Sequence, residues 1–103
     1  MTLNSYETVY ILKSDVNEDE NLSLVNKYKL LIKENGGKNI FIQHRGRRNL
    51  RYSIQNYYDG IYVQMNYEGN GRLIQTIEKS MKLNENIIRF LTLRQDVLQG
   101  IKL

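Results

Sequence analysis

The sequence lacks cysteine, proline, tryptophan and alanine, and it contains a single histidine. Without cysteine, the chain can form neither a disulfide nor a thiolate metal site, and it has no thiol nucleophile. One histidine, His44, cannot build a histidine metal cluster alone. No apolar run approaches the roughly 18 residues that cross a bilayer, and residues 1–7 lack the basic start and apolar run of a signal peptide. These absences predict a soluble, intracellular protein that uses no metal and no cofactor.

The length of 103 residues predicts one domain, because a domain commonly holds roughly 150 residues. The composition is 41% hydrophobic and 25% charged, which is typical of a globular chain. We expect a single domain over residues 1–103, with an ordered core over about 5–95 and a short C-terminal tail over 96–103. The absence of alanine and proline, whose codons are GC-rich, indicates an AT-rich gene, as in plastids and some bacteria.

Positive charge is concentrated in one part of the chain. Lysine and arginine number 15 against 11 acids, for a net charge of +4. No acid occurs between Lys38 and Tyr58, whereas the acids gather between Asp15 and Glu20. The acid-free stretch contains five cations, Lys38, Arg45, Arg47, Arg48 and Arg51. This asymmetry predicts a local surface that binds a polyanion.

Two segments have the apolar period of a helix. Asn17 is a good N-cap, and Glu20 three residues later completes a capping box. The apolar stripe that follows is Leu24, Val25, Tyr28, Leu31 and Ile32, and Gly36 can take the positive φ beyond the helix end. A second helix is predicted after Asn70, with the stripe Leu73, Ile74, Ile77 and Met81 and an end near Leu83.

Four segments read as strands, at residues 6–13, 38–54, 60–68 and 87–93, with a turn at 56–59. In the first strand Tyr6, Thr8 and Tyr10 share one face, and Val9 and Ile11 share the other. Gly46 interrupts the second strand, which indicates a bulge or a close approach of the backbone to another molecule.

The order βαββαβ predicts a ferredoxin-like α+β fold, a four-stranded antiparallel sheet with both helices on one face. Right-handed crossovers should place the first and third strands side by side in the centre, and we expect them to be parallel. The other face would be uncovered and would display Tyr10 and Tyr62.

The second strand carries the most informative chemistry. Arg45, Arg47, Arg48 and Arg51 place four guanidinium groups within seven residues, and arginine binds phosphate through a rigid fork. Gly46 lacks the side chain that would hold a backbone away from RNA. The alternative interpretation is a solvated edge strand that its charges protect from aggregation. Because no acid nearby neutralises the run, we favour polyanion binding.

Tyrosines on an open sheet face can stack on unpaired bases or on a protein partner. An RRM-like single-strand RNA binder is one alternative, but the third strand reads Asp-Gly-Ile-Tyr-Val at 59–63, which matches the RRM motif poorly. An enzyme is not predicted. The carboxylates show no close pair for acid–base work, and the first loop, at 13–17, lacks the glycine and arginine of small ferredoxin-like acyl phosphate hydrolases.

Five segments in order resemble the bacterial-type (bacterial or plastid) small-subunit ribosomal protein six family over nearly all of residues 5–95. The segments are the first strand at 6–13, the glycine pair at 36–37, the arm at 46–54, the third strand at 60–67 and the closing segment at 83–94. The arm reads Gly-Arg-Arg-Asn-Leu-Arg-Tyr-Ser-Ile, similar to the family pattern Gly-Arg-Arg-x-Leu-x-Tyr-Pro-Ile. The chain departs from this family by having Ser53 and Ser14 where proline is common, and neither change removes a charged or stacking group.

The resemblance implies a non-catalytic structural protein of the small ribosomal subunit in a bacterium or a plastid. It further implies binding to the central domain of small-subunit (16S) rRNA, together with small-subunit ribosomal protein eighteen. Carried over by position, Arg45, Arg47, Arg48 and Arg51 would bind rRNA, and Tyr10 and Tyr62 would face the protein partner. Lys38 and Gly46, from the same acid-free stretch, complete the set of residues predicted to bind rRNA. No transit peptide is visible, so a plastid protein would require an organelle gene. The competing class is a ferredoxin-like regulatory or dimerising module with an incidental basic arm.

Overall fold

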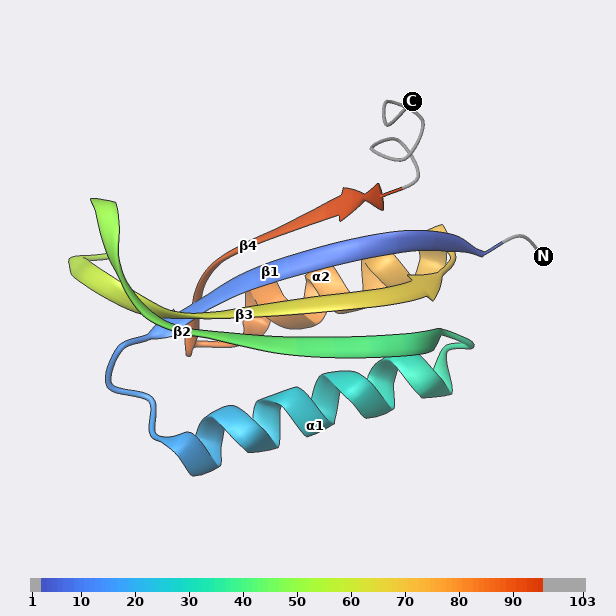
Figure 1. Cartoon of the computed structure of the whole chain (residues 1–103), viewed down its shortest axis with the longest axis horizontal. Helices are drawn as coiled ribbons and strands as arrows, with labels where there is room; N and C mark the ends of the chain where they lie inside the picture. The colour runs from blue at the N-terminus through green and yellow to red at the C-terminus, as the bar shows by residue number, and fades with distance from the viewer. Residues whose placement is uncertain (1–2, 96–103) are drawn as a thin grey trace.

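The structure is a computed structural model that describes residues 3–95. It has the predicted order of elements, β1 (Asn4–Lys13), α1 (Glu18–Glu34), β2 (Lys38–Ile54), β3 (Tyr57–Gly69), α2 (Gly71–Leu83) and β4 (Ile87–Arg94) (Figure 1). The expected tail at 96–103 lies outside the described residues. Within residues 3–95, neither helix is long and apolar enough to cross a membrane. The predicted ferredoxin-like βαββαβ fold is confirmed.

All three strand pairs of the sheet are antiparallel, and the strand order is β2-β3-β1-β4. The prediction that the first and third strands are central neighbours is confirmed, but the prediction that they are parallel is wrong. The α1 crossover makes β2 run in the same direction as β1, and a tight hairpin then reverses the chain into β3. Strand β3 must therefore run against β1.

Both helices begin and end where the sequence predicts. The side chain of Asn17 accepts from the backbone N–H of Glu20 at 2.8 Å, and the Glu20 carboxylate accepts from the N–H of Asn17 at 3.3 Å. Asn70 caps α2 through the N–H of Leu73 at 2.9 Å. These bonds satisfy donors that the first helical turn leaves free. Gly36 has a φ of +82° beyond the end of α1.

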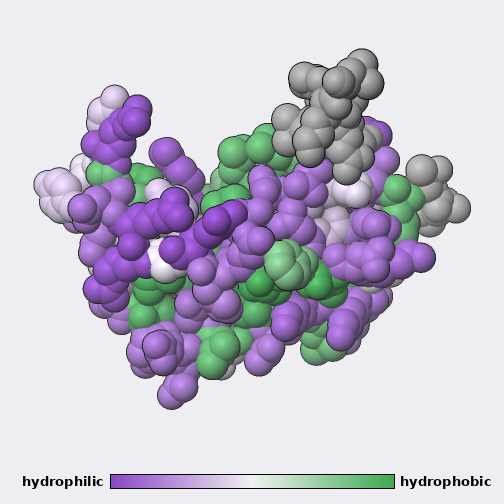
Figure 2. All heavy atoms as spheres, viewed as in Figure 1, coloured by the Kyte–Doolittle hydropathy of each residue, from purple (hydrophilic) through white to green (hydrophobic). Residues whose placement is uncertain are grey.

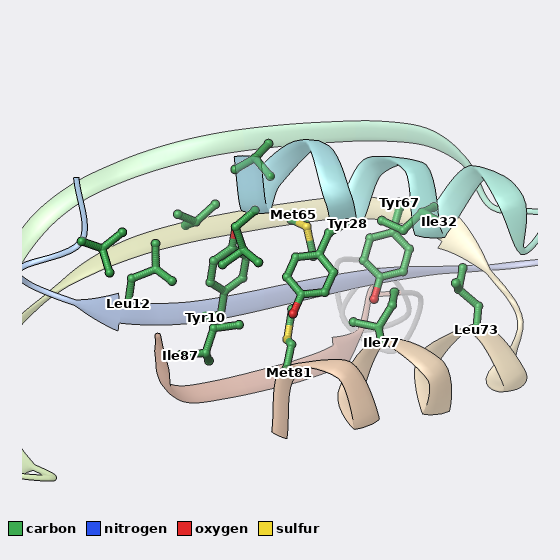
Figure 3. Close-up of a cluster of buried hydrophobic side chains, with 14 residues drawn as sticks. Tyr10, Leu12, Tyr28, Ile32, Met65, Tyr67, Leu73, Ile77, Met81 and Ile87 are labelled. Carbon is green, nitrogen blue, oxygen red and sulfur yellow. The ribbon is translucent and has the colours of Figure 1, made fainter. Parts of the chain in front are cut away.

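The helices cover the face of the sheet that carries Thr8, Tyr10 and Leu12, all three fully buried. Figure 3 shows Tyr10 and Leu12 among the buried hydrophobic side chains. The prediction that Tyr10 lies on the open face is wrong. Tyr10 pairs with Val63 on one side and Phe90 on the other, and its ring lies 5.8 Å from that of Tyr28 on α1. Tyr6, Thr8 and Tyr10 share one face of β1, as the sequence predicts. The helices cover that face, because its large side chains pack against the apolar stripes of both helices.

Two core tyrosines differ in the hydrogen bonding of their hydroxyl groups. Thr8 Oγ1 and Tyr67 Oη lie 2.7 Å apart, and Thr8 Oγ1 also lies 2.9 Å from Thr92 Oγ1. Burial raises the pKa of Tyr67 to about 12. Burial also raises the pKa of Tyr10, whose hydroxyl has no hydrogen-bond partner in the part of the chain that the structure describes.

The hairpin between β2 and β3 turns earlier than predicted. Gln55 and Asn56 form the turn with φ values of +51° and +69°. Two consecutive positive φ values are typical of the two-residue turns that fit the twist of a hairpin. The expected turn at 56–59 is therefore wrong for residues 57–59, which belong to β3.

Candidate nucleic-acid interface

The β2–β3 hairpin extends beyond the rest of the sheet. Strand β1 ends at Lys13, opposite Gly60, whereas β2 and β3 continue to pair with each other as far as Ile54 and Tyr57. In Figure 1 this extension bends away from the sheet at the left. Arg51 and the exposed Tyr52 lie on this extension, whereas Arg45, Arg47 and Arg48 precede it, on the part of β2 that flanks the four-stranded sheet.

Gly46 forms a bulge, which is one of the two roles that its place in the strand indicates. The pairing register shifts between His44 and Gly46, and Gly46 has a φ of +82°. A Cβ atom added there would meet no atom within 4 Å. The backbone conformation, rather than lack of space, therefore accounts for glycine at this position.

The bulge distributes the arginines around the edge of the sheet. Without its extra residue Arg45 and Arg47 would share a face, but after the bulge it is Arg48 that shares the open face with Arg45. Arg47 pairs with Ile61 and lies on the helix side, where its Nη2 donates to the Ser14 carbonyl at 2.7 Å. The arginines therefore surround a strand edge instead of forming one flat basic face.

The open-face arginines are held by neighbours on β3. Nε and Nη2 of Arg45 donate to Gln64 Oε1 at 3.1 and 2.8 Å. The Arg48 guanidinium lies 5.7 Å from the centre of the Tyr62 ring. Among residues 3–95, none of the four arginines has a carboxylate partner, so their charge is available to an anion.

Lys38 is not brought to the arginines. It lies at the opposite end of β2, seven residues from Arg45, which corresponds to roughly 23 Å of strand. Its register partner is Glu68 on β3. The remaining predicted residue, Tyr62, does lie on the open face, half-buried opposite Ile11.

The open face also carries a feature that the sequence did not reveal. Gln64 Nε2 donates to Glu7 Oε1, 2.6 Å away, so a polar row runs from Arg45 through Gln64 to Glu7. Around this row lie apolar side chains whose exposed fractions are 58% for Phe41, 58% for Leu91 and 45% for Leu93. The register places all three on the open face, because they pair with Asn66, Val9 and Glu7. Only the cross-strand register brings these three apolar side chains to one face of the sheet, and no local sequence motif predicts that arrangement.

Replacing Gly46 with alanine is expected to lower the free energy of unfolding by about 1–2 kcal/mol, the cost of a left-handed conformation in a residue with a Cβ. Gly71→Ala is the matched control, because a Cβ atom at Gly71 would also meet open space, whereas the φ of Gly71 is not positive. Urea denaturation of both variants provides the measurement. Equal stability of the two variants would show that the bulge conformation is not strained for alanine.

The fold and the exposed groups together define a small ferredoxin-like protein whose accessible surface is cationic along one sheet edge and partly apolar on its open face. The family model described as ribosomal protein S6 matches residues 5–94. The chain belongs to the ribosomal protein S6 family.

Relatives of this chain come from both plastids and bacteria. The plastid small ribosomal subunit protein bS6c of Pyropia yezoensis is 61% identical over 93 residues, which cover 90% of this chain and 85% of that protein. The bacterial protein bS6 of Picosynechococcus is 42% identical over 93 residues, covering 90% and 81%. The crystal structure of 30S ribosomal protein S6 from Thermotoga maritima has a TM-score of 0.87 at 28% identity and covers 98% of this chain and 95% of that one. The chain is thus a structural, non-enzymatic constituent of the small ribosomal subunit of a bacterial or plastid ribosome.

Proposed function

We propose that this chain binds the central domain of small-subunit rRNA through the basic arm, and that it does so together with small-subunit ribosomal protein eighteen. The observation that carries the proposal is the set of exposed arginines on and beside the projecting hairpin, without a carboxylate partner among the described residues. Arginine contacts phosphate through charge-assisted, often bidentate hydrogen bonds.

The placement of the arginines supports a particular mode of RNA binding. A phosphate backbone that crosses the edge of β2 meets Arg45 and Arg48 from the open face and Arg47 from the helix side. Arg51 extends this contact along the hairpin. Lys38 lies too far away to join the same few phosphates, so it would contact a separate RNA segment.

The open face is the better docking surface for a protein partner. A second RNA-binding protein is expected to be basic, and like charges would repel it from the arm. The open face instead offers Tyr62, the exposed leucines of β4 and the Glu7 carboxylate. Tyr10 has no part in this surface because it is buried. Its burial removes one of the two rings expected on the open face of the central strands, which weakens the RRM-like alternative.

Replacing Leu91 and Leu93 together with serine is expected to reduce the cooperative gain in RNA binding that protein eighteen provides, by about 1–3 kcal/mol. Tyr62→Ser should have an effect in the same direction. Because Leu91 and Leu93 lie on β4, away from the arginines of β2, the RNA affinity of the isolated protein should change little in the leucine variant. Calorimetric titration of central-domain rRNA, with and without protein eighteen, measures both quantities.

Leu83→Ser is the control for this experiment, because Leu83 is 76% exposed but belongs to α2 on the helix-covered side. It should leave the cooperative gain unchanged. A loss of RNA affinity in Tyr62→Ser without the partner would mean that Tyr62 stacks on RNA or positions Arg48 for RNA binding. An unchanged gain in the Leu91 and Leu93 variant would contradict docking on the open face.

A further inference from the structure

A cleft of about 440 Å³ opens beside the bulge on the helix side of the sheet. It lies between the first turns of α1 and the edge strand β2. Val16, Leu22 and Ile61 provide its apolar surface, and the polar side chains around them include His44, Arg47 and Asn21. Figure 2 shows hydrophobic surface at the lower left, beneath a band of strongly hydrophilic side chains. The cleft thus combines an apolar floor with a few polar groups, as sites for small planar ligands do.

We propose that this cleft receives one unstacked RNA base that carries an exocyclic amine, namely adenine, cytosine or guanine. The inference rests on the proposed rRNA binding and assigns a second, base-contacting element to it. The cleft adjoins the arm directly, since Gly46 and Arg47 belong to its lining. An RNA strand whose phosphates lie along Arg45 and Arg48 would pass the mouth of this cleft.

The lining favours a base over a phosphate group. Glu18 and Asn21 on α1 belong to the lining, and the hydrogen-bond acceptors of a carboxylate and an amide match an amine donor rather than an anion. The Oδ1 atom of Asn21 is buried without a hydrogen-bond partner among residues 3–95, so an amide that turns this oxygen toward a ligand in the cleft gains a hydrogen bond and loses none. Uracil has no exocyclic amine, so it would leave these acceptors unsatisfied.

The lining also favours a base over an aliphatic side chain of a protein. His44 and Arg47 present planar groups, on which bases stack in single-stranded RNA complexes. The hydrogen bond from Arg47 to the Ser14 carbonyl fixes that guanidinium in place before any ligand arrives. Leu22 is 54% exposed on α1, and a base would cover it. An aliphatic side chain would cover the leucine but would leave the polar groups of the wall without partners.

The test uses the full chain and single-stranded hexaadenylate, with hexauridylate as the comparison. His44→Ala is expected to weaken hexaadenylate binding about tenfold, and Leu22→Gln about fivefold, on the scale of one stacked base. Leu30→Gln is the matched control, because Leu30 is 57% exposed on the same helix but does not line the cleft. Fluorescence anisotropy at several salt concentrations gives the affinities, and NMR titration with adenosine monophosphate locates the contact.

The salt dependence separates this inference from the proposed function. The Leu22→Gln variant removes no charged group, so it should weaken binding with the same salt slope as the original chain. Equal affinity of the Leu22→Gln and Leu30→Gln variants would overturn the base site while leaving arginine-dependent RNA binding in place. Equal weakening of both oligonucleotides by His44→Ala would overturn the preference for an amine. Absence of salt-dependent binding by the original chain, to hexaadenylate and to central-domain rRNA alike, would overturn the proposed function and the base site together.

Discussion

Replacing Arg45, Arg47, Arg48 and Arg51 together with glutamine should flatten the plot of log affinity for central-domain rRNA against log salt by about three units. Each phosphate contact contributes a slope of roughly −0.7 to −0.9, because binding releases counterions from the nucleic acid. The four guanidinium groups lie around one strand edge and have no carboxylate partner among the described residues, so each can contact a phosphate. Filter binding between low and moderate salt measures the slope directly.

A control must separate local contact from net charge. Glutamine at Lys29, Lys33, Lys79 and Lys82 also removes four charges, but all four lysines lie on the two helices. This helix variant should keep nearly the full slope. If both variants flattened the plot equally, the interaction would depend on the overall charge of the protein and the arm would not be the RNA contact.

The stability of the arginine variant should be measured beside its affinity. Arg47 donates to the Ser14 carbonyl, so its replacement removes a bond that secures the loop between β1 and α1. The expected cost is about 1 kcal/mol, which should leave the protein folded at room temperature. Arg45→Gln loses its bonds to Gln64, but both side chains are accessible to water. A well-folded variant with a reduced slope would therefore report on RNA contact alone.

The helices of this protein could be predicted because their information is local. Each helix cap joins residues that are three apart in the sequence: Asn17 bonds with Glu20, and Asn70 bonds with Leu73. The apolar stripe of each helix follows directly after its cap. Strand directions depend on the whole chain path. The prediction that β1 and β3 are parallel was wrong because their relative direction depends on the α1 crossover and the β2–β3 hairpin together. No local sequence pattern contains both connections.

The candidate site was predicted less completely, for a reason that lies in strand periodicity. A period of two shows which residues share a face, but it does not show which face the helices cover. Ile11 on the open face is nearly as buried as Tyr10 in the core, so apolar character alone could not separate the two faces of β1. The sequence also predicted the bulge at Gly46 but not its effect on Arg47, because one inserted residue reverses the orientation of every side chain beyond it.

The largest expected loss of stability follows from the position of Tyr10. Tyr10→Ser should lower the free energy of unfolding by about 3–5 kcal/mol, the range observed when a large buried ring is removed and leaves a cavity. The ring contacts Tyr28 of α1, and the residue pairs with Val63 and Phe90, so both layers of the protein lose packing. Urea denaturation measures the loss. A stability close to that of the original protein would mean that the ring does not lie in the core.

Tyr10→Phe distinguishes the ring from its hydroxyl group. Because the hydroxyl of Tyr10 is buried without a partner among the described residues, its removal should be neutral or should raise stability by about 1 kcal/mol. Tyr67→Phe provides the opposite case, because Tyr67 shares a 2.7 Å hydrogen bond with Thr8, and its loss should cost about 1 kcal/mol. RNA affinity should remain unchanged in both phenylalanine variants, since neither side chain reaches the arm or the open face. A stable Tyr10→Phe variant with impaired partner binding would instead require the hydroxyl to reach the surface, which its position beneath the helices does not allow.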